Sequence, residues 1–170
     1  MSHPLESQLV SWMGMSHAIW MRHAHPWSFA TRVPVLPLLA LAIWSRAWWG
    51  AWALVPVAVL LGWIWLNPRA FPRPRSTRNW ASQAVLGERV WLNRQRIAVP
   101  HYHRRMPIIL EWVSVAGLPF LGWGLWQLAL GPTVLGLVLS VGSKLWFCDC
   151  MVWLYRDMQE AVPEYREWLY

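Results

Sequence analysis

The sequence predicts an all-α integral membrane protein, with four transmembrane helices paired into two helical hairpins and an amphipathic helix at the N-terminus. Of the 170 residues, 56% are hydrophobic and 14% are charged, whereas a soluble domain usually carries about 25% charged residues. Four apolar stretches are each close to the ~20 residues that span a bilayer, and a soluble chain of this length could not bury them all. They cover residues 29–48, 50–66, 108–128 and 133–155.

The distribution of positive charge predicts the orientation. Apart from Arg46 and Lys144, the 15 lysines and arginines lie near the N-terminus, within residues 67–106, or after Tyr155. Because positively charged loops remain cytoplasmic, we expect both termini and the central segment on the cytoplasmic side of a prokaryotic inner membrane. The net charge of +7 then faces anionic lipid headgroups and indicates no nucleic-acid partner.

Tryptophan is abundant, at 17 residues. Its ring is apolar and its N–H needs a polar partner, so tryptophan settles at the headgroup level of a bilayer. Trp44, Trp48, Trp49 and Trp52 surround the first expected hairpin tip. The pattern indicates an aromatic belt and helix packing, with stacking on a pigment or quinone as the alternative.

Residues 5–24 predict the amphipathic helix, which Pro26 ends. We expect it to lie in the cytoplasmic interface or to pack on the central segment. The first hairpin follows, with Ser28 as a candidate N-cap and Arg32 close enough to the membrane surface to reach the headgroups. The whole chain forms a single membrane domain in which residues 67–106 are a basic cytoplasmic segment.

Three motifs carry a resemblance to a known family. They are Arg22-His-Ala-His-Pro-Trp-Ser-Phe-Ala-Thr-Arg32, Asn67-Pro68-Arg69 and Val85-Leu-Gly-Glu-Arg89. The chain resembles, over essentially its whole length, a family of small uncharacterised prokaryotic membrane proteins with an Arg-His-Ala-Asn-Pro-Trp-Ser motif near the N-terminus. The resemblance implies a membrane architecture and no particular activity. His25 stands where that motif has asparagine, which disfavours a role for an imidazole there, while His23 matches.

Histidines and carboxylates make one candidate site. Two histidine pairs fall at the expected cytoplasmic face, and two carboxylates lie about one turn inside the third and fourth spans. Imidazole and carboxylate groups at one depth could bind zinc or iron, although the histidine spacings of membrane di-iron enzymes are absent. The candidate metal ligands are His23, His101, His103, Glu111 and Asp149.

Ion pairing is the alternative use of these groups. A charge inside a membrane costs about 2.5–3.5 kcal/mol on insertion scales and normally faces a partner. The candidates for structural ion pairs are Arg32, Glu111, Lys144 and Asp149. Lys144 lies near the middle of the expected fourth span, and we expect Glu111 of the neighbouring helix to be its partner.

The sequence contains no phosphate-binding loop, nucleophile elbow, zinc-protease motif or metal-spaced cysteine pair, so it indicates no catalytic residue and favours a non-enzyme. We expect a structural or accessory subunit, bound to another membrane protein or to itself. One alternative is a metal-dependent membrane enzyme. Another is a protein that handles small ions or lipids around Lys144.

Overall fold

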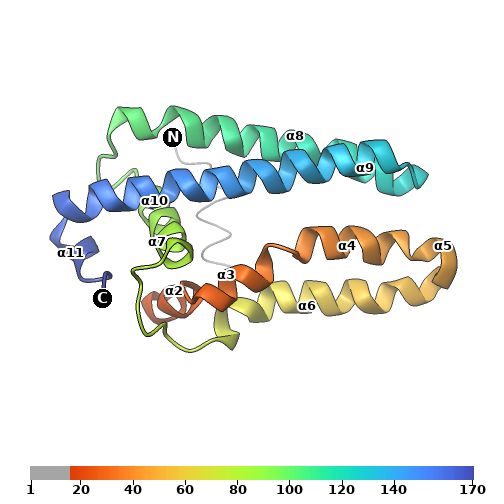
Figure 1. Ribbon diagram of the computed structural model, residues 1–170, viewed down its shortest axis with the longest axis horizontal. Helices are drawn as coiled ribbons and strands as arrows, with labels where there is room; N and C mark the ends of the chain where they lie inside the picture. The colour runs from red at the N-terminus through yellow and green to blue at the C-terminus, as the bar shows by residue number, and fades with distance from the viewer. Residues whose placement is uncertain (1–15) are drawn as a thin grey trace.

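The computed structural model describes residues 16–170, and all regular structure within that range is helical (Figure 1). Residues 5–15 of the predicted N-terminal helix lie outside the described range. The elements are α2 (His17–His23), α3 (Pro26–Arg32), α4 (Val35–Trp44), α5 (Arg46–Trp49), η1 (Gly50–Ala53), α6 (Leu54–Ala70), α7 (Trp80–Leu92), η2 (His101–His103), α8 (Arg105–Gln127), α9 (Leu130–Leu137), η3 (Val138–Gly142), α10 (Ser143–Ala161) and α11 (Pro163–Arg166).

Within the described residues, three helical stretches are long and apolar enough to cross a membrane. They are Pro26–Ala70, His101–Gln127 and Leu130–Ala161. The first stretch folds back on itself, so that α4 lies beside α6, and we call α3–α6 the first helix pair (Figure 1). In the second helix pair, α8 runs beside the nearly continuous helix of α9, η3 and α10.

The breaks between helices follow from local backbone chemistry. Pro34 lacks an N–H and lies between α3 and α4, where the helix is interrupted. The turn between α5 and η1 contains Gly50 with φ of 54°, a value that glycine adopts without steric cost. At the other tip, Leu128 adopts φ of 53° and ends α8, its N–H bonded to carbonyls of the last turn.

Small residues set the spacing of the second helix pair. A Cβ on Gly136 of α9 would lie 2.4 Å from the backbone nitrogen of Leu121 in α8, and a Cβ on Gly124 would lie 2.4 Å from that of Thr133. Both positions require glycine because the two backbones approach so closely. This is the usual device by which membrane helices gain contact when no hydrophobic force drives them together.

The main apolar core lies away from the tips, where α7 packs on α10 (Figure 1). Leu86 and Trp91 of α7 and Met151 and Tyr155 of α10 are each at most 1% exposed. Gly87 faces the carbonyl of Met151 so closely that a Cβ would lie 1.9 Å from its oxygen. The last part of the apolar stretch 133–155 is therefore buried against another helix of the same chain.

The helix α2 joins this core rather than standing apart from it. Trp20 and Met21 are buried in the cluster, and Arg22 donates hydrogen bonds to the carbonyls of Phe71, at 2.8 Å, and Arg69. The described part of the predicted N-terminal helix thus packs on the central segment.

The N-cap expected at Ser28 is wrong. A new helix begins at Pro26 with His25 as its N-cap, where the ring Nδ1 accepts from the backbone N–H of Trp27 at 3.2 Å. The hydroxyl of Ser28 is buried and donates to Oδ1 of Asn67 in α6 at 2.8 Å. This bond ties the start of the first helix pair to its end.

Candidate functional site

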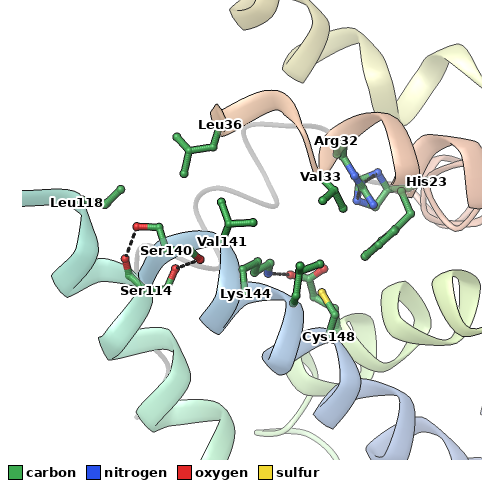
Figure 2. A pocket seen from close by; sticks show the side chains of 13 residues that line it. His23, Arg32, Val33, Leu36, Ser114, Leu118, Ser140, Val141, Lys144 and Cys148 are labelled. Carbon is green, nitrogen blue, oxygen red and sulfur yellow. Dashed lines mark hydrogen bonds and ion pairs between the residues drawn. The ribbon is translucent and has the colours of Figure 1, made fainter. Parts of the chain in front are cut away.

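A cavity of about 380 Å³ lies between the two helix pairs, where α3 and α4 face η3 and α10 (Figure 2). The pairs touch at their tips, where Arg46 donates to the carbonyls of Leu125 and Trp126, at 2.6 Å each. Ala40 packs against Leu121 and Leu125 nearby. At the far end, α3 contacts α7, which is packed on α10. The cavity therefore occupies the space between two regions of contact.

Two basic side chains, one carboxylate and one imidazole, from four different helices, line one end of this cavity. They are His23 of α2, Arg32 of α3, Glu88 of α7 and Lys144 of α10. Nζ of Lys144 lies 2.7 Å from Oε1 of Glu88, and the guanidinium of Arg32 donates to the ring of His23. Figure 2 shows Lys144, Arg32 and His23 directed toward this end of the cavity.

Three of these four groups lie at or next to the end of a helix. His23 and Arg32 are the last residues of α2 and α3, and Lys144 is the second residue of α10, directly after the π-helical turn η3. Glu88 follows Gly87, a point at which the backbones of α7 and α10 approach closely. The cluster therefore depends on the packing of α7 against α10 as much as on the membrane-length helices.

The cavity carries one surplus positive charge at neutral pH. Burial and the charge of Arg32 lower the pKa of His23 to about 3, so its imidazole is neutral. Burial raises the pKa of the Glu88 carboxyl, but the charge and hydrogen bond of Lys144 outweigh it, so the net shift is downward. Glu88 is therefore ionised and balances one of the two cations, Arg32 and Lys144.

The rest of the lining is largely apolar. Ser114 and Ser140 interrupt it, but each hydroxyl donates to the other residue's carbonyl, at 3.1 and 3.0 Å, across α8 and η3. Turns of π-helix such as η3 are often found at functional sites. The apolar lining residues are Phe29, Val33, Leu36, Leu118, Val141 and Leu145. The cavity is thus charged at one end and hydrocarbon-like at the other.

A family model matches residues 4–167 of the chain, and it describes a family of unknown function, DUF6653. The chain belongs to the DUF6653 family. No curated protein and no solved structure matches the sequence. The cavity of this DUF6653 protein therefore has to be interpreted from its own geometry.

The predicted metal ligands of the DUF6653 chain are dispersed. Of the five, only His23 lines the cavity. Within residues 16–170, no three histidine, cysteine or acidic side chains are placed to hold a metal ion together. His103 pairs with Asp157 at 2.7 Å, and His101 is exposed beside the ring of Tyr102.

The ion-pair partner expected for Lys144 is wrong, because Glu111 and Asp149 point elsewhere. Glu111 accepts a hydrogen bond from the indole N–H of Trp91 at 3.0 Å, and Asp149 accepts one from that of Trp80 at 2.9 Å. Both carboxylates thus join the membrane-length helices to α7. Arg32, the fourth ion-pair candidate, contacts His23 instead of a carboxylate in the described structure.

Sequence reasoning missed Glu88. It lies outside the four apolar stretches, so the argument that a charge inside a membrane needs a partner did not apply to it. A signal was nonetheless present, because Glu88 belongs to the Val85–Arg89 motif that carried the family resemblance. The neighbouring Gly87, a glycine inside α7, also marks a position of close packing.

Proposed function

We propose that this DUF6653 protein crosses the prokaryotic inner membrane four times and binds a small anion in the cavity between its helix pairs. The spans are α3–α4, α6, α8 and α9–α10, arranged as two hairpins. Both termini, α7 and α11 lie on the cytoplasmic side. The concentration of arginine outside the apolar stretches supports this orientation.

The position of Lys144 carries the functional part of the proposal. Its ammonium is paired with Glu88, yet 51% of its side-chain surface remains accessible, and the residue lines the cavity. Cations inside or beside a membrane are costly and usually mark a ligand or ion site. With Arg32 on the opposite wall, an anion would meet two cations and a single competing carboxylate.

An accessory role in a larger complex is the second candidate. Trp48, Trp52 and Trp126 are between 73% and 76% exposed near the tips of the two helix pairs. Indoles in that position suit either the headgroup layer or a partner protein. Copurification of another membrane protein at fixed stoichiometry from native membranes would support this role.

The test of anion binding compares two ligands of equal length. Full-length protein in an uncharged detergent is titrated with hexanoate and with hexanamide, and binding heat is measured by calorimetry. We expect saturable binding of hexanoate only, weakened about tenfold or more in Lys144→Met, because a charge-assisted contact is lost. Arg105→Met, at an exposed site outside the cavity, is the control and should bind hexanoate normally. The proposal would be contradicted if hexanamide bound as tightly as hexanoate, or if Lys144→Met bound hexanoate as tightly as the wild type.

A further inference from the structure

The polarity of the cavity lining changes along its length. His23, Arg32 and Lys144 lie toward one end, while Leu36 and Leu118 lie toward the other, beyond Val141 (Figure 2). Ser114 and Ser140 also lie toward the Leu118 end, and each is bonded to the other's carbonyl. The hydrocarbon end therefore presents few polar groups that a hydrated ion could use.

We propose that the ligand is an amphiphile with one negative charge on its head and an acyl chain. The head lies between Arg32 and Lys144, and the chain passes Val33, Leu36 and Val141 toward Leu118. The inference rests on the anion-binding function proposed above and specifies the class of ligand. It applies equally to a fatty-acid carboxylate and to the phosphodiester of an anionic phospholipid, which share this chemistry.

The single negative charge of the ligand head is inferred from the charges that line the cavity. Arg32 and Lys144 carry two positive charges and Glu88 carries one negative charge, so a single negative charge completes neutralisation. A zwitterionic head would bring a further cation next to Lys144. A doubly charged head would leave one negative charge without a partner between apolar helices, which is unfavourable in a low dielectric.

The acyl chain of the ligand is inferred from the apolar end of the cavity. A free inorganic anion would occupy only the charged end and leave the apolar walls uncovered. A hydrocarbon chain covers those walls, and each methylene that leaves water strengthens binding about fourfold. Affinity should therefore rise with chain length until the chain reaches beyond Leu36 and Leu118.

The experiment measures chain-length dependence with the full-length protein in nanodiscs of zwitterionic lipid. Native mass spectrometry counts bound ligand for butanoate, octanoate and hexadecanoate, each compared with its uncharged methyl ester. Subtracting the ligand retained by Lys144→Met corrects for partition into the lipid. A further arm offers hexadecanoate and phosphatidylglycerol in equal amounts, and the preferred anion identifies the natural source.

Two matched variants on α4 separate the chain from the head. Leu36→Gln places an amide at the apolar end of the cavity, whereas Leu41→Gln places it on an exposed face of the same helix. We expect Leu36→Gln to bind butanoate as the wild type does and to lose tenfold or more of the affinity for hexadecanoate. Leu41→Gln should follow the wild type for both ligands.

The outcomes separate the two proposals. If butanoate binds as tightly as hexadecanoate, the amphiphile is excluded and the anion site remains. The same conclusion follows if Leu36→Gln and Leu41→Gln behave alike. If no chain length gives binding that depends on Lys144, both the amphiphile and the anion-binding function are overturned.

Discussion

Nζ of Lys144 in α10 lies 2.7 Å from Oε1 of Glu88 in α7, and this ion pair joins the two helices whose contact forms the main core. Glu88 has two effects there. It stabilises the cationic lysine, and it competes with an incoming anion for the same ammonium. Removal of its charge should therefore weaken the fold and strengthen the site.

Glu88→Gln should lower the free energy of unfolding by about 1–2 kcal/mol, between the values for exposed pairs and for broken buried pairs. The same change leaves Arg32 and Lys144 without their opposing charge, so hexanoate should bind several-fold more tightly. Thermal unfolding in detergent and calorimetric titration measure the two effects. Glu160→Gln, at an exposed position, should change neither, and weaker binding by Glu88→Gln would contradict the assigned role of Glu88.

His23 should make stability depend on pH. Its folded pKa of about 3 lies below the ordinary imidazole pKa of 6.5, so between these values the unfolded chain binds a proton that the folded chain does not. Stability should therefore fall on acidification below about pH 6.5, by up to ~1.4 kcal/mol per pH unit, and be independent of this group above it.

The measurement is the melting temperature at a pH of about 7.5 and at a pH of about 5. His23→Gln should show a smaller decrease on acidification than the wild type, retaining the part due to His17, whose pKa burial and Arg89 also lower. His101→Gln serves as the matched control at an exposed site. An unchanged pH dependence in His23→Gln would show that this imidazole is not held neutral.

Gly87→Ala should be among the most damaging single changes. Its Cβ would lie 1.9 Å from the carbonyl oxygen of Met151, and α7 would have to move away from α10, at a cost of about 3 kcal/mol or more. Gly62→Ala in α6 is the matched control, since nothing lies within 4 Å of its added Cβ. That variant should be neutral or stabilised by up to ~1 kcal/mol through helix propensity, and thermal unfolding of the two variants distinguishes them.

Helical structure was predictable from the sequence because the length of an apolar stretch is a local property. The four apolar stretches lie largely in helices, whereas the break between α3 and α4 at Pro34 falls inside the first stretch and was not predicted. The burial of Met151 and Tyr155 was not predictable in the same way. A face that packs on lipid and a face that packs on α7 have the same apolar composition, and only the folded chain separates them.

The candidate site was predictable only in part. Arg32 and Lys144 were predicted because a charge inside a membrane is costly, and His23 was predicted because it matches the family motif. All three residues line the cavity. The partner of Lys144 could not be inferred, since the choice among Glu88, Glu111 and Asp149 depends on which faces of α7 and α10 meet. Indole N–H groups of Trp80 and Trp91 engage two of these carboxylates, and a sequence pattern does not reveal such pairings.

The packing of α7 on α10 also has a consequence for synthesis of the chain. Glu88 and Lys144 are separated by 56 residues, so α7 leaves the ribosome well before the helix that covers it. At about 5–20 residues per second, the delay is roughly 3–11 s. Throughout that time the apolar face of α7 does not yet have α10 to pack against.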